Sequence, residues 1–227
     1  YSLSLSAWKE YGQNRWSLRV NPSSGNLHPT EGYVVAPALP GLHTKPAVYH
    51  YAPKEHCLER RTELSEADWK SLMGSYPPNA FLIGLSSVHW RESWKYGERA
   101  YRYCQHDAGH ALAALRISAA LLGWGLRVLD DVPDEHIKRL LGLDRPDGFL
   151  PEERENPDLL AVVLPGGPLT EPANRAKDLP EQAVQTVARG VWTGSANRLS
   201  TDHVPWDIIA AVSEACEKRN PITVPRR

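Results

Sequence analysis

The order of the secondary-structure elements predicts an α+β domain, with a central sheet packed against long helices and a helical C-terminal extension. Short β-prone runs come first, a long helical pattern occupies the middle of the chain, and a last apolar strand follows it. This order does not match the regular strand–helix alternation of a doubly wound parallel sheet. We therefore expect the domain at residues 1–169 and a helical extension, or a linker to a second module, at residues 170–227.

The first third of the chain contains short elements separated by turn-forming residues. Residues 2–11 (SLSLSAWKEY) are interpreted as a short helix. Residues 21–31 (NPSSGNLHPTE) combine Pro, Ser, Gly and Asn, which is typical of a loop. Ser65 and Asp68 resemble the start of a capped helix. Strands are expected at residues 32–36 and 80–85, and a hairpin at 47–51 and 56–60.

A helix from about Tyr96 to Leu122 is the clearest pattern in the sequence. The segment is rich in Ala and Leu, has no proline, and repeats apolar residues at steps of three and four. Gly123 and Gly125 then supply a stop. Beyond them we expect a buried strand at residues 159–164 and helices at 134–141, 180–189 and 205–218.

Composition narrows the class of protein. Hydrophobic residues make up 41% of the 227 residues and charged residues 23%, a balance typical of a globular protein. Lys plus Arg number 26 and Asp plus Glu 27, so no net charge would attract nucleic acid or an anionic membrane. Three cysteines and no apolar run long enough to span a bilayer favour a reducing, cytoplasmic location.

Two segments carry side chains suited to chemistry. Ser23, Ser24 and Asn26 offer hydroxyls, an amide and open backbone N–H groups that could hold the polar parts of a planar heterocycle, although an ordinary turn has the same composition. Lys95 and Tyr96 are two adjacent proton donors at the expected start of the long helix. A solvated lysine beside a core tyrosine is the plainer alternative.

Both segments resemble motifs of the FMN-dependent nitroreductase superfamily. The run PSSGNLHP (22–29) is similar to its Pro-Ser-Ser signature, with His28 in place of a Gln. The run WKYGERAYRY (94–103), followed by DAGH (107–110) in place of an EAGH-like turn, resembles the SagB/ThcOx-type dehydrogenase branch. The likeness covers about residues 15–168 and is greatest to the N-terminal half of tandem two-module members.

The resemblance implies a function and a site. FMN would carry the hydride, Ser23, Ser24 and Asn26 would contact it, and Arg19 is a weaker candidate for the same role. Lys95 and Tyr96 would be the acid–base pair in the oxidation of a small azoline-type substrate. Because the family's flavin lies at a dimer interface, we expect a homodimer or a pseudo-dimer with a second module. The alternatives are an NAD(P)H-dependent nitro or quinone reductase and a degenerate, non-catalytic dimerisation module.

Two departures from a simple flavin site remain. The N-terminal Arg-Arg-Ser-type segment that grips the FMN phosphate in the family is missing at Tyr1. Cys104, His106 and His110 have a spacing that can bind zinc, but no glutamate follows His106 as a metalloprotease base. We therefore expect no metal.

Overall fold

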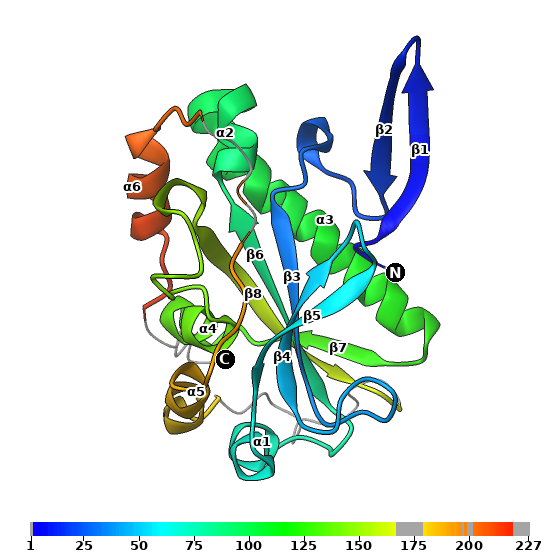
Figure 1. Cartoon of the computed structure of the whole chain (residues 1–227), viewed down its shortest axis with the longest axis vertical. Coiled ribbons are helices and arrows are strands. Elements are labelled where there is room, and N and C mark those ends of the chain that lie inside the picture. The colour runs from blue at the N-terminus through cyan, green and yellow to red at the C-terminus, as the bar shows by residue number, and fades with distance from the viewer. Residues whose placement is uncertain (1, 167–178, 197, 199–201, 220–227) are drawn as a thin grey trace, which may run out of the picture.

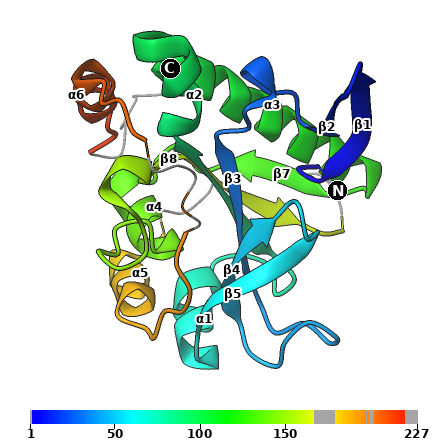
Figure 2. The same cartoon turned by 45° about the horizontal axis from the view of Figure 1, so that its top comes forward.

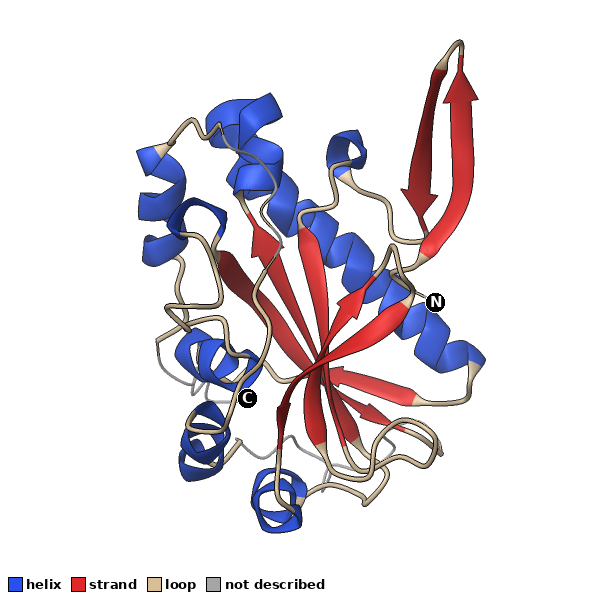
Figure 3. Cartoon of the chain, viewed as in Figure 1, coloured by secondary structure: helices blue, strands red, loops and turns tan. Residues whose placement is uncertain are grey.

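A six-stranded antiparallel sheet is the centre of the molecule, with strand order β5-β4-β3-β6-β8-β7 (Figures 1 and 3). The computed structural model describes residues 2–166, 179–196, 198 and 202–219. The sheet consists of β3 (Thr30–Ala36), β4 (Ala47–Ala52), β5 (Cys57–Glu63), β6 (Phe81–Val88), β7 (Gly125–Val128) and β8 (Glu155–Leu164). The predicted α+β class and the four predicted early strands are confirmed, whereas β7 was not recognised in the sequence because it has only four residues.

The predicted helix at residues 2–11 is wrong: this segment is one arm of a hairpin that projects away from the sheet (Figure 1). β1 (Leu5–Tyr11) pairs with β2 (Asn14–Arg19) across a two-residue turn, in which Gly12 has φ +60°. Cross-strand contacts stabilise the pair, because Arg15 forms an ion pair with Glu10 at 3.1 Å and lies over the Trp8 ring. These contacts depend on residues outside the segment, so its local pattern could not reveal them.

The predicted long helix is confirmed over Ala100–Leu121, and a separate helix that was not predicted precedes it. α2 (Trp90–Tyr96) ends at Gly97, whose φ of 58° and ψ of −137° are not helical, and a single 3-10 turn leads into α3 (Ala100–Leu121). Lys95 and Tyr96 therefore end a helix rather than starting one. The DAGH run lies within α3 and is not a turn.

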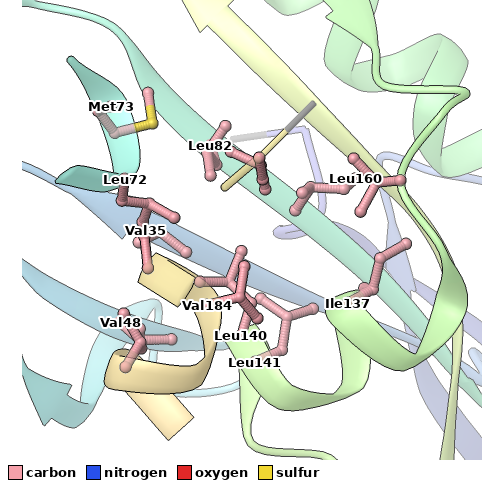
Figure 4. Packing of buried hydrophobic residues seen from close by; sticks show 14 of the residues in the cluster. Val35, Val48, Leu72, Met73, Leu82, Ile137, Leu140, Leu141, Leu160 and Val184 are labelled. Carbon is pink, nitrogen blue, oxygen red and sulfur yellow. The ribbon is translucent and has the colours of Figure 1, made fainter. Parts of the chain in front are cut away.

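Helices cover both faces of the sheet (Figures 1 and 2). α3 lies across one face, where Ala111 and Leu115 pack against Leu85. α1 (Glu66–Met73), α4 (Asp134–Leu141) and α5 (Glu181–Ala188) lie on the other face, over the main core. Figure 4 shows ten labelled members of this core, which come from the sheet and all three helices: Val35, Val48, Leu72, Met73, Leu82, Ile137, Leu140, Leu141, Leu160 and Val184. The capping box predicted at Ser65 is present at the start of α1.

The C-terminal part of the chain packs on the domain. Val184 of α5 is fully buried in the main core, and Thr193 donates its backbone N–H to Arg61 O of β5 at 2.8 Å. α6 (Asp207–Ala215) lies against α3. The expected boundary between residues 169 and 170 falls outside the described residues. No helix in the described ranges combines the length and hydrophobicity needed to cross a bilayer, and all three cysteines are free thiols.

A pair of glycines tests how tightly α4 is packed. Gly142 ends α4 with φ +70°, and a Cβ there would lie 2.5 Å from the Trp192 ring, which is held by a bond from its Nε1 to Ala188 O. Gly123 has almost the same backbone, φ +69°, but open space around it. Both substitutions to Ala incur the left-handed strain of about 1–2 kcal/mol. We predict that Gly142→Ala loses roughly 1–3 kcal/mol more because of the clash.

Urea unfolding of both variants and the wild type measures this difference in the free energy of unfolding. Equal losses for Gly142→Ala and Gly123→Ala would show that Trp192 moves aside without cost.

Candidate functional site

The loop of residues 21–29 is tied to α3 by one carboxylate. Asp107 accepts hydrogen bonds from Ser23 Oγ at 2.5 Å, Ser24 N at 3.0 Å and Ser24 Oγ at 3.1 Å. Ser23 Oγ in turn accepts from His28 N at 2.8 Å, which closes the loop on itself. Asp107 has no exposed surface. Both predicted serines are thus fixed in position by a residue whose role the sequence reading did not identify.

The backbone of this loop is in an uncommon conformation. Gly25, Asn26 and His28 have φ of 60°, 61° and 52°. The Asn26 amide is held at both ends, since Nδ2 donates to Ser17 O of β2 at 2.8 Å and Oδ1 lies 2.9 Å from His28 Nε2. Asn26 therefore links the loop to the projecting hairpin. Non-glycine residues with positive φ persist only where the surroundings enforce them, and they cluster at functional sites.

Lys95 and Tyr96 lie directly against this loop. A Cβ built on Gly25 would be 2.6 Å from Tyr96 Oη and 2.7 Å from Lys95 Nζ. Any side chain at position 25 would therefore collide with both groups. The Lys95 side chain is exposed, and its Nζ lies 5.4 Å from the centroid of the Tyr96 ring. The structure thus brings together the two segments that the sequence singled out separately, although Gly25 and Lys95 are 70 positions apart in the chain.

A network of buried charges lies beneath the loop. Glu31 of β3 forms ion pairs with Arg91 of α2 and with His50 of β4, the latter at 2.7 Å, and Arg91 also donates to His28 O at 3.0 Å. Burial opposes ionisation of Glu31, but the charge of Arg91 and the hydrogen bond from His50 lower its pKa to about 2. Burial alone would lower the pKa of His50, but Glu31 raises it to about 9. Glu31 thus holds α2, β4 and the loop together.

Arg19 and His28 complete the environment of the loop. Arg19 is half-buried at the end of β2, and burial lowers its pKa. Among the described residues, none accepts a hydrogen bond from its guanidinium. Burial, together with Arg19 and Arg91, lowers the pKa of His28 to about 4, so this ring is neutral near pH 7.

Glu92 is a buried acid that the sequence reading missed. It has no exposed surface, and neither carboxyl oxygen has a hydrogen-bond partner. Burial and the nearby Asp107 charge raise its pKa to about 8, while Lys95 acts in the opposite direction. Glu92 is therefore mostly protonated at neutral pH, which avoids two adjacent buried negative charges.

The zinc-like spacing of Cys104, His106 and His110 does not form a site. Cys104 is buried, whereas His106 and His110 are exposed. Residues two apart on a helix point in different directions, so the three side chains do not converge. In the ranges that the structure describes, no group of three potential ligands is placed to hold a metal ion.

The Glu31–His50 pair predicts a pH dependence of stability. A raised histidine pKa stabilises the fold fully below pH 6.5, and this contribution is lost as the pH rises through about 9. We therefore expect this pair to lower stability between pH 6.5 and 9 by an amount on the order of 2–3 kcal/mol. His50→Gln should remove this contribution and leave the smaller decline that follows from the raised pKa of Glu92.

Glu59→Gln is the matched control, because Glu59 contacts the other ring nitrogen of His50 but its side chain is 51% exposed. It should keep most of the decline. Denaturant unfolding at several pH values measures the slopes, and an unchanged slope in His50→Gln would contradict the assignment.

Comparisons with known proteins agree with this geometry. Residues 12–150 match the model of the Nitroreductase family. A protein of Methanocaldococcus jannaschii with a provisional nitroreductase name is 28% identical over 130 residues, which are 55% of this chain and 64% of that protein. A crystal structure from Anabaena variabilis with a similarly provisional name aligns with TM-score 0.64 and 25% identity, over 98% of this chain but only 42% of the other.

The Escherichia coli microcin synthetase McbBCD complex aligns with TM-score 0.51 and 20% identity, over 71% of this chain and 59% of that one, which shows a shared fold only. The chain thus spans less than two thirds of the length of each relative named here. The family model covers more than half of the chain, and it includes the Ser23–Asn26 loop, Lys95, Tyr96 and Asp107. The chain belongs to the nitroreductase family.

Proposed function

We propose that this chain is the flavin-binding module of an FMN-dependent dehydrogenase of the SagB/ThcOx type. One observation carries the proposal: Lys95 Nζ and Tyr96 Oη lie against Gly25, in the centre of the loop proposed to hold the flavin. An acid–base pair must lie beside the bound cofactor to remove a proton as hydride leaves the substrate. A simple nitroreductase has no need of this pair.

The residues present fit a flavin mononucleotide. Arg19 is a half-buried cation without an acceptor among the described residues, which suits an anionic or electron-rich group. Asn21 Oδ1 and Thr30 Oγ1, at the two ends of the loop, are buried without partners. Buried polar groups that lack partners are uncommon and mark places where a partner is missing. We assign Arg19, Ser23, Ser24 and Asn26 to flavin binding, with Asp107 as the residue that positions the serines.

The mechanism divides the work between cofactor and chain. A bound flavin would accept the hydride. Lys95 would remove the substrate proton from the neighbouring carbon or nitrogen, and Tyr96 would donate a hydrogen bond that orients the substrate. The contact of Gly25 with the side chains of Lys95 and Tyr96 would exclude water from that side of the site. The substrate we propose is a small azoline-type ring.

A second module or a second copy of the chain would complete the site. The chain covers only 42% of the Anabaena variabilis protein, which leaves room for another module of similar size. The C-terminal end of α3 presents Ile117, Leu121 and Leu122 with exposures of 62%, 82% and 61%. A contiguous apolar surface of this kind is typical of an interface. We propose a homodimer or a pseudo-dimer on this basis.

One prediction of the proposed function concerns cofactor binding. FMN should bind saturably, with quenching of its fluorescence, and Asn26→Ala should weaken binding because the loop loses its bonds to Ser17 and His28. Asn79→Ala removes a comparable amide bond, to Pro165 O, at a distant turn and should leave binding unchanged. Absence of quenching both in this chain and in its full-length parent would exclude the flavin assignment.

Another prediction of the proposed function concerns the acid–base pair. Lys95→Ala and Tyr96→Phe should retain flavin but lose roughly 10²–10⁴-fold in the rate of single-turnover flavin reduction by an azoline substrate. Lys54→Ala, in an exposed turn, and Tyr11→Phe, at the exposed end of β1, are matched controls and should react at the wild-type rate. Flavin reduction in Lys95→Ala at the wild-type rate would make the pair structural and favour an NAD(P)H-dependent nitro or quinone reductase.

A further inference from the structure

A cavity lies between α6, the start of α3 and the beginning of β8. Its volume is about 880 Å³, within the usual range for small-molecule sites. None of the residues assigned to flavin binding or to the acid–base pair is among the described residues that line it. It is therefore separate from the loop at Gly25.

Asp158 is the central polar group of this cavity. The residue occupies a β-bulge, since Leu85 pairs with Leu159 and Ser86 pairs with Pro157, which leaves Asp158 without a partner on β6. Bulges redirect a side chain out of the sheet pattern and are common next to sites. The carboxylate accepts from Ser87 Oγ at 2.6 Å and from Gln105 Nε2 at 3.4 Å. Both donors are neutral, so in the described part of the chain no cation balances this charge.

His89 is the second polar group with free capacity. It is only 9% exposed and lines the cavity. Burial lowers its pKa to about 4, so the ring is neutral, and its Nδ1 lies 3.3 Å from the amide Nδ2 of Asn156. An amide nitrogen can only donate, which places the ring proton on Nε2. This N–H has no acceptor among the described residues.

Aromatic rings form the walls. Trp90, Tyr101 and Trp206 all line the cavity. Trp90 stacks near His203 with ring centroids 4.7 Å apart, and Trp206 packs on Gly97, where a Cβ would lie 3.1 Å from its ring. The faces of such rings attract organic cations.

The charges of the residues that line the cavity also favour a cationic ligand. Six carboxylate side chains and three Lys or Arg side chains line the cavity. The ion pair of Lys138 with Glu217 removes one of each, which leaves five carboxylates and two cations. A cleft lined by an excess of one charge attracts ligands of the opposite charge. Burial raises the pKa of Asp158 to about 7, so a cation beside it would gain an ionised partner above that pH.

We infer that this cavity is a binding site for a small organic cation that carries an aromatic ring. The ammonium group would pair with Asp158, the ring would lie among Trp90, Tyr101 and Trp206, and His89 Nε2–H would donate to a polar atom of the ligand. The inference does not depend on the flavin assignment, because the two sites share no residue.

Isothermal titration calorimetry of the full chain at pH 8 tests this with two probes. Tyramine carries an ammonium group, a ring and a phenol oxygen, while tyrosol has a neutral hydroxyl in place of the ammonium group. Tyramine should bind saturably with a Kd below about 1 mM, and tyrosol should bind at least about tenfold more weakly because it lacks the charge. Equal affinities, or no saturable heat from tyramine up to about 10 mM, would overturn the inference.

Two variants locate the site. Asp158→Asn should weaken tyramine binding at least about tenfold. Glu135→Gln is the matched control, because Glu135 is an exposed α4 carboxylate that does not line the cavity, and its affinity should equal that of the wild type. Tyramine binding that survives Asp158→Asn would also overturn the inference. The comparison of tyramine with tyrosol needs only wild-type protein, so it decides the question even if a variant does not fold.

Discussion

The bonds from Asp107 to Ser23 and Ser24 are the constraint on which the candidate site depends. They join a loop near the start of the chain to a helix 84 residues later. A buried carboxylate costs free energy unless it is hydrogen-bonded, and the two serines supply those bonds. Once the loop is fixed in this way, Gly25 lies against Lys95 and Tyr96. The position of the site thus depends on the hydrogen bonds that the buried Asp107 carboxylate requires.

The charges beneath the loop reinforce the same arrangement from the other side. Glu31 is on β3, but it is paired with Arg91 of α2 and His50 of β4, so one buried carboxylate joins three elements. Removing one partner of such a network leaves an uncompensated buried charge, which is far more costly than losing the attraction itself. Glu92 is the opposite case, a buried acid that stays neutral beside Asp107 because no partner is provided. Glu31 is thus ionised where its charge joins three elements, whereas Glu92 is neutral where no cation is paired with it.

Local sequence patterns predicted the elements whose stability is local. The strands of the sheet other than β7, and α4, were found because their apolar residues are contiguous or helically spaced, and the Ser23–Asn26 loop because its composition is distinctive. The β1–β2 hairpin was misread because its stability lies in pairs such as Glu10 with Arg15. The helix α2 was missed because it has only seven residues and is separated from α3 by the non-helical Gly97. A signal for Asp107 did exist, since a carboxylate next to Ala108 and three residues after Cys104 lies on the apolar stripe of α3.

The position of β8 in the sheet affects how the chain can fold during synthesis. β8 is hydrogen-bonded to β6 on one side and β7 on the other, yet it is the last strand of the sheet to be made. A nascent chain can pair β3, β4, β5 and β6, but until residue 164 has left the ribosome β6 has an open edge and β7 has no partner. Unpaired edges and exposed apolar helices are the surfaces that chaperones bind and that aggregate when they are not protected. The edge of β6 therefore stays unpaired while residues 89–164 are synthesised, and this is the interval in which the sheet is open to pairing with another chain.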